Sequence, residues 1–136
     1  MVAMTIAMLA VTAMHWRQRD VSLCRRVLSG LAQGKPWVQR DVAWDRFAAM
    51  GNDVGTVYQK LPNDGERLQY RMAFVQRFAD GFQRAQANVD NFGRWRIVAR
   101  EPGRTIVATD CKPTGSTLQF QISTNGPHRV EAIQWQ

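Results

Sequence analysis

The chain has 136 residues, of which 45% are hydrophobic and 21% charged, the composition of one folded domain with a sizeable core. Its formal charge is +7, yet the 18 basic residues are spread along the chain, which excludes a dedicated basic tail. We interpret this charge as a basic surface, with attraction to anionic lipid or nucleic acid as the alternative.

The chain begins with an apolar segment, Met1 to Trp16, whose first fourteen residues carry no charge. A spanning helix needs about 20 apolar residues, so this segment is too short to cross a bilayer alone. It is either the remnant of an export signal or membrane anchor, or an apolar helix packed on the domain or on a partner. Because Trp16 is followed by Arg17 and Arg19, it also suits a membrane interface. We therefore expect a membrane-associated or exported protein, with one α+β domain over residues 17–136.

Three helical segments are predicted in the first two-thirds of the chain. The first starts at an Asp20 cap and ends before Gly34, and its apolar side consists of Cys24, Val27, Leu28 and Leu31. The second follows Lys35-Pro36 and stops at Gly51, because Trp37, Trp44, Phe47 and Ala48 recur at helical spacing.

The third predicted helix is the longest. Asn63, with Glu66 three residues later, forms a start that resembles a capping box. One face is then apolar, formed by Leu68, Met72, Val75, Ala79 and Phe82 and widened by Phe74 and Phe78. We expect this amphipathic helix to lie across the sheet.

Four strands are predicted next, over Arg94–Arg100, Arg104–Lys112, Ser116–Ser123 and His128–Trp135. The short gaps between them are rich in Pro, Gly and Asn and cannot hold a crossover helix, so the strands should pair as an antiparallel meander. The predicted fold is therefore α+β, three helices followed by a four-stranded antiparallel, strongly curved, cone-like meander.

The predicted sheet has an apolar face and a polar face. In its first strand Trp95, Ile97 and Ala99 alternate with arginines, so one face of the sheet carries Arg94, Arg96, Arg100, Gln119 and Gln121. This polar face either meets solvent or forms an interface with a second copy or another protein.

The two cysteines, Cys24 and Cys111, have two interpretations. In an oxidising compartment they would form a disulfide between the first helix and the sheet, worth roughly 4–5 kcal/mol in the chain-entropy model. Otherwise they are two buried free thiols. Neither has a Cys or His cluster around it, so the sequence predicts no metal site and no zinc.

Several phrases carry a family resemblance across residues 20–136. The chain has Leu28-Ser29-Gly30-Leu31-Ala32-Gln33-Gly34-Lys35 at the end of its first helix, then Trp44-Asp45-Arg46-Phe47, Trp95-Arg96-Ile97-Val98 and a closing Val130-Glu131-Ala132-Ile133-Gln134-Trp135. With the order of elements, they resemble the cystatin-like, nuclear transport factor 2-like superfamily. The resemblance implies a bent sheet wrapped around a long helix, a cone that often holds an apolar pocket, and a homodimer.

Enzymes of that superfamily place a carboxylate, His or Tyr inside the cone. The weak catalytic candidates here are Asp45, Tyr58, Asp110 and His128, and each has an ordinary surface or paired role as its alternative. If a pocket exists, we expect its lining to include Trp44, Phe47, Tyr58, Trp95 and Phe120. No nucleophile elbow, phosphate loop or metal-hydrolase motif occurs, and no cofactor is predicted.

The sequence favours a non-catalytic interaction or assembly module that acts through its sheet face or a hydrophobic cone. The alternative is a protein that binds an apolar small ligand, or a proton-transfer enzyme of the ketosteroid isomerase-like type. Nucleic-acid binding is disfavoured because no exposed aromatic residue alternates with the arginines of the first strand.

Overall fold

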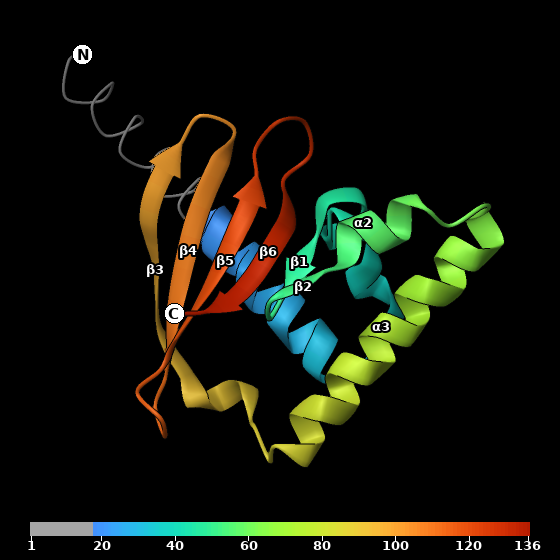
Figure 1. Ribbon diagram of the computed structural model, residues 1–136. Coiled ribbons are helices and arrows are strands. Elements are labelled where there is room, and N and C mark those ends of the chain that lie inside the picture. Colours follow the sequence, from blue (N-terminus) through green and yellow to red (C-terminus); the bar gives the residue numbers. More distant parts are fainter. Residues whose placement is uncertain (1–17) are drawn as a thin grey trace.

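A computed structural model describes residues 18–136 and has the predicted α+β class (Figure 1). The predicted Met1 to Trp16 segment lies outside the described residues. Within residues 18–136, no helix is long and apolar enough to cross a membrane.

Short helices and strands connect two long helices and a sheet. The N-terminal helix covers residues 18–32, and α3 covers Asp64–Arg84. Between them lie η1 (Pro36–Asp41), η2 (Trp44–Arg46), β1 (Ala48–Ala49), β2 (Asn52–Asp53) and α2 (Val54–Gln59). After α3 come η3 (Val89–Asn91), β3 (Phe92–Glu101), β4 (Arg104–Cys111), β5 (Thr117–Ser123) and β6 (Arg129–Trp135).

The sheet corrects the predicted fold. It has six strands in the order β2-β1-β6-β5-β4-β3, with β2 and β3 as its two separate edges. Strands β3 to β6 pair antiparallel with their neighbours, but β1 pairs parallel with β6, so the sheet is mixed and open. The predicted four-stranded, cone-like meander is therefore wrong. Strands of two residues, as β1 and β2 are, carry too little periodicity to be detected in a sequence.

Sheet pairing also explains why the second predicted helix does not form. This region contains two short 3-10 helices instead, separated by extended backbone at Val42. Val42 bridges to Val130 in parallel, and the Ala43 amide donates to the Val130 carbonyl at 2.9 Å. Pairing with β6 thus overrides the helical spacing of the aromatic residues.

The N-terminal helix, and not α3, covers the sheet. It runs behind the sheet in Figure 1, while α3 stands to the side of it. The core between helix and sheet includes Leu28, Leu31, Phe120, Ile122 and Ile133. The expectation that α3 lies across the sheet is therefore wrong.

One end of each long helix follows the sequence prediction, namely the C-terminal end of the N-terminal helix and the start of α3. Gly34 has a φ of +66°, and the Lys35 amide donates to the Gly30 carbonyl at 2.9 Å, which closes the N-terminal helix. The Asn63 side chain accepts a hydrogen bond from the Glu66 amide at 2.9 Å, which caps the start of α3.

Bulges in β3 change which residues share a face. The register shifts between Gly93 and Arg96 and again between Ile97 and Ala99. As a result Arg100 pairs opposite Thr105, which pairs opposite the buried Ile122, so Arg100 lies on the core face. Ala99 lies on the outer face. The predicted alternation therefore holds for the first part of β3 only.

Candidate functional site

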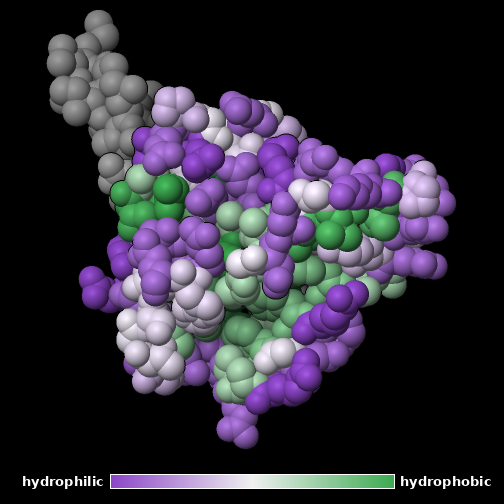
Figure 2. All heavy atoms as spheres, in the orientation of Figure 1, coloured by the Kyte–Doolittle hydropathy of each residue, from purple (hydrophilic) through white to green (hydrophobic). Residues whose placement is uncertain are grey.

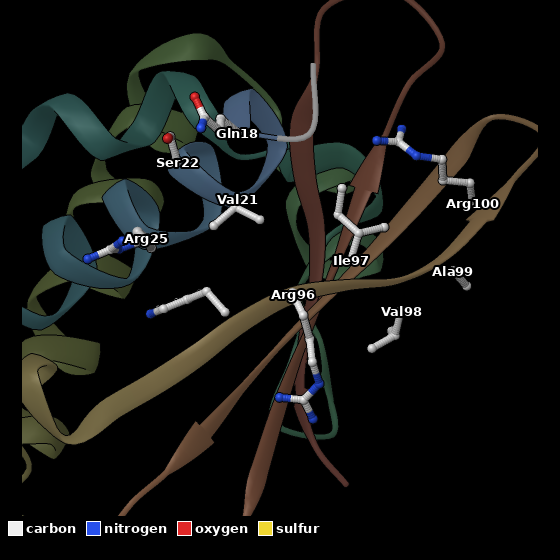
Figure 3. Close-up of a pocket in the computed structure, with 10 residues that line it drawn as sticks. Gln18, Val21, Ser22, Arg25, Arg96, Ile97, Val98, Ala99 and Arg100 are labelled. Carbon is white, nitrogen blue, oxygen red and sulfur yellow. The ribbon is translucent and has the colours of Figure 1, made fainter. Parts of the chain in front are cut away.

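Two hollows among the described residues are candidate binding sites. The first lies between the N-terminal helix and the β3 edge (Figure 3). It measures about 840 Å³ and carries three arginines, Arg25, Arg96 and Arg100. Their side chains point in different directions in Figure 3 and do not converge on one point. Arg96 donates to Asp110 at 3.1 Å and Arg100 pairs with Asp20 at 3.7 Å. Its lining includes Gln18, the first residue that the structure describes.

The second hollow lies between the C-terminal half of α3 and the end of β6, and measures about 690 Å³. Figure 2 shows it as a depression lined in green between the sheet and α3. Its lining is mainly apolar and comes from the core, α3, the β1–β2 turn, β3, β6 and the β4–β5 connection. It includes Leu28, Met50, Phe78, Gly81, Phe82, Phe92, Cys111, Pro113, Leu118 and Trp135.

A smaller hollow of about 490 Å³ continues along α3 toward the β1–β2 turn and α2. It shares Met50, Arg77 and Phe78 with the larger one, so the two are adjoining parts of one depression. Its further lining includes Ala49, Asn52, Asp53, Val54, Val57, Tyr70 and Phe74. We call the two parts together the α3 groove.

A row of aromatic rings follows the α3 groove. Phe74, Phe78 and Phe82 are spaced four residues apart on α3, so they lie on one helix face. The row continues from Phe82 to Phe92 at a centroid distance of 6.3 Å and from Phe92 to Trp135 at 6.2 Å. Only Val75 and Ala79 are fully buried in α3, whereas its aromatic residues Tyr70, Phe74, Phe78 and Phe82 are partly buried against the core.

Gly81 lies among the α3 residues that line the larger part of the groove. A Cβ atom built on Gly81 meets no other atom within 4 Å, and its φ is not positive. Neither packing nor backbone geometry therefore requires glycine at this position. Glycine inside a helix costs about 1 kcal/mol relative to alanine, so the open space here is kept at some cost in stability.

Charge in the α3 groove is sparse. Arg77 is the one charged side chain among the described residues that line the larger part. No hydrogen bond or ion pair to another residue of the range 18–136 engages it. In the smaller part, Asp53 accepts hydrogen bonds from the Thr56 hydroxyl at 2.6 Å and the Thr56 amide at 3.1 Å. These bonds lower the pKa of the Asp53 carboxyl, which caps α2.

The aromatic residues predicted to line a pocket lie outside the α3 groove. Trp44, Phe47 and Phe120 are buried in the core. Trp95 lines the hollow at the β3 edge, and the centroid of its ring lies 5.6 Å from that of Phe120 in a tilted arrangement. Tyr58 is half-buried, and its hydroxyl accepts a hydrogen bond from Arg71 at 2.7 Å.

The weak catalytic candidates are not brought together. Asp45 is exposed and pairs with Arg46 at 3.5 Å, next to the buried Trp44. His128 contacts the buried Asp20 carboxylate through Nδ1 at 3.0 Å. Tyr58 has the Arg71 partner described above. Each of these groups thus has a local partner, and none lines the larger part of the α3 groove.

Asp110 belongs to a hydrogen-bonded network on the outer sheet face. Arg96 donates to its carboxylate at 3.1 Å and the Thr117 hydroxyl at 2.9 Å, and these bonds lower the pKa of Asp110. Arg94 adds an ion pair at 3.5 Å. Gln119 and Gln121 also lie on this face, which no described helix covers, whereas Arg100 lies on the other. The predicted interface residues are thus divided between the two faces.

Both cysteines are free thiols in the structure, and only Cys24 is fully buried. Cys24 is buried in the N-terminal helix, and burial raises the pKa of its thiol, with a further contribution from the Asp20 carboxylate. Cys111 is half-buried and lines the α3 groove. Within residues 18–136, no group of three or more His, Cys, Asp or Glu side chains is placed to hold a metal ion.

Comparisons with protein-family models, curated proteins and solved structures gave no match. The resemblance to the nuclear transport factor 2-like superfamily therefore stays a prediction. The groove residues themselves were missed by sequence reasoning, although Gly81 gave a signal, because a glycine inside a strong helical pattern has a packing or functional reason in many proteins.

Proposed function

We propose that this protein is a binding module that takes an apolar ligand into the α3 groove. Gly81 carries the proposal, because this position leaves space open in the larger part of an apolar groove where a side chain would stabilise the helix. The larger part alone, about 690 Å³, falls in the usual range of small-molecule sites.

The surroundings of the groove support the same function. Its aromatic floor runs from α3 across β3 to Trp135, so the sites of contact come from elements far apart in the sequence. Ligand sites in proteins are mostly apolar with a few polar groups, which is the composition of this lining. The sheet is open and forms no enclosed cone, so this proposal follows the alternative expectation, a protein that binds an apolar small ligand, with the groove in place of the expected cone pocket.

A neutral apolar dye tests this proposal on the full chain. We expect Nile red to bind with a rise in fluorescence, and Gly81→Leu to weaken binding at least tenfold by filling the groove. The same substitution should raise the free energy of unfolding by about 0.5–1 kcal/mol, because leucine is the better helix former.

Gln83→Leu is the matched control, since it adds the same side chain to the exposed surface of α3 outside the groove. It should leave Nile red affinity unchanged. Equal affinity of the wild type and Gly81→Leu, or no dye binding at all, would overturn the proposal.

A further inference from the structure

One charged group stands in the middle of the α3 groove. Arg77 lines both parts, beside Phe78, at the place where they join. Some exposed arginines of the described chain have acidic partners, such as Arg26 with Asp41 at 3.0 Å and Arg46 with Glu131 at 3.2 Å, whereas exposed arginines outside the groove such as Arg25, Arg40 and Arg129 have none within residues 18–136. Arg77 has no such partner within residues 18–136.

The lack of a partner matters once the groove is filled. Arg77 is exposed to solvent, which can hydrate its guanidinium. A purely apolar ligand would displace part of that water and offer no hydrogen-bond acceptor in return, which is costly for a cation. A ligand with an anionic group would instead form a charge-assisted hydrogen bond, the stronger kind.

The charges also determine the orientation in which an anionic ligand would lie along the groove. The smaller part of the groove contains the Asp53 carboxylate, which repels an anion. The larger part contains no acidic side chain among its described lining residues, and its aromatic row leads from Phe78 through Phe82 to Trp135. An apolar chain attached to the anionic group therefore fits into the larger part.

We infer that the ligand is an anionic amphiphile, an unbranched acyl chain with one terminal carboxylate. The carboxylate binds Arg77, and the chain lies along Phe78, Phe82, Phe92 and Trp135. The formal charge of +7 favours the approach of such an anion. This inference rests on the proposed function and names the ligand class of the same groove.

Decanoate, decanol and decyltrimethylammonium test the inference as competitors of Nile red on the full chain. They share the same ten-carbon chain and differ in head-group charge, and each is used below its micelle-forming concentration. We expect Arg77→Gln to weaken decanoate about tenfold, the value of one hydrogen bond to a charged group, and to leave decanol unchanged. Decyltrimethylammonium should compete more weakly than decanol with the wild type.

Arg84→Gln is the matched control, because it removes the same charge from α3 outside the groove lining. It should change the affinity of neither ligand. Alkylation of Cys111 by iodoacetamide gives a second readout of position, since a chain in the groove should slow this reaction. The buried Cys24 serves as the internal reference.

The outcomes separate the two proposals. If decanol and decanoate compete equally and both are lost in Gly81→Leu, the groove binds apolar ligands and the inference about the anion is wrong. If Arg77→Gln and Arg84→Gln weaken decanoate equally, the effect is general charge and the inference is also wrong. If none of the three ligands binds and Nile red also fails to bind, both proposals fall.

Discussion

The two long helices have similar sequence patterns but very different environments. In the N-terminal helix, Cys24, Val27, Leu28 and Leu31 are all inaccessible to solvent because the sheet lies against them. In α3, a helix of 21 residues, only Val75 and Ala79 are buried. An amphipathic pattern thus predicts a helix and its apolar face, whereas the opposing element decides how much of that face is covered.

Two glycines make the same contrast at the level of single atoms. A Cβ on Gly30 of the N-terminal helix would lie 2.9 Å from the Val38 Cβ, which is closer than packed carbon atoms come. A Cβ on Gly81 of α3 would meet nothing within 4 Å. The first glycine permits close packing, and the second leaves a groove.

The largest expected difference is between two leucines. Leu31→Ala should lower the free energy of unfolding by about 2–5 kcal/mol, because Leu31 is 0% exposed in the core. Leu68→Ala on α3 should cost less than about 1 kcal/mol, because Leu68 is 45% exposed. Urea denaturation of both variants measures the difference, and equal losses would mean that α3 is as well packed as the N-terminal helix.

Substitutions at the two glycines should change the stability of the protein in opposite directions. Gly30→Ala should destabilise the protein by about 1–3 kcal/mol. The new methyl group would lie 2.9 Å from the Val38 Cβ, which is bonded to the backbone and cannot move away by a change of rotamer. Gly81→Ala should stabilise it by up to about 1 kcal/mol through helix propensity alone. Thermal unfolding of the pair measures both effects, and a loss of stability in Gly81→Ala would contradict the open space at that position.

Much of the fold follows from the sequence. Gly34, Asn63 and the four long strand segments are recognisable because each depends on local chemistry, namely positive φ, a side-chain cap or alternating polarity. The parallel pairing of β1 with β6 was not recognisable, because it joins residues far apart through strands of two residues. The predicted cone-like meander is wrong because it lacks this long-range pairing.

The candidate site was harder to predict than the fold. Trp44, Phe47 and Phe120 were expected to line a pocket because they are aromatic, yet they fill the core. Phe82, Phe92 and Trp135 come from three separate elements and line the groove, although Phe92 is itself buried and Phe82 is partly buried against the core. Composition identifies aromatic candidates for both the core and the groove lining, and only the tertiary structure shows which residue lies in which.

Asp20 illustrates the limit of local reasoning about charge. It was expected to cap the first helix, but it lies within that helix and its carboxylate is 2% exposed. Arg100 reaches it at 3.7 Å because the β3 bulge turns Arg100 to the core face, and His128 reaches it at 3.0 Å. A register shift of one residue therefore converts a predicted interface arginine into a partner of a buried acid.

A third pair of variants tests this contrast between the covered and the open face of the sheet. Arg100→Ala should lower the free energy of unfolding by about 1–3 kcal/mol, because it leaves the buried Asp20 with one partner fewer. Arg94→Ala on the same strand removes an ion pair at the surface and should cost less than about 0.5 kcal/mol. Similar losses from both variants would place Arg100 outside the buried network.

The smallest expected effect concerns Asp110 on the open face. Hydrogen bonds from Arg96 and Thr117 hold its pKa below the ordinary value of 3.8, so folding favours the carboxylate. The unfolded chain therefore binds this proton first, and the stabilisation is complete above pH 3.8 and is lost as the pH falls through the folded-state pKa.

Asp110→Asn should consequently weaken the dependence of the free energy of unfolding on pH in the acidic range. The free energies of unfolding of the variant and the wild type should converge at the lowest pH. Asp53, whose pKa is also lowered, titrates in both proteins and cancels in the difference. Urea denaturation at a series of pH values measures this. A difference that stays constant down to the lowest pH would show that Asp110 acts through hydrogen bonds that survive protonation, and that its charge is not what joins β4 to β3 and β5 on the open face.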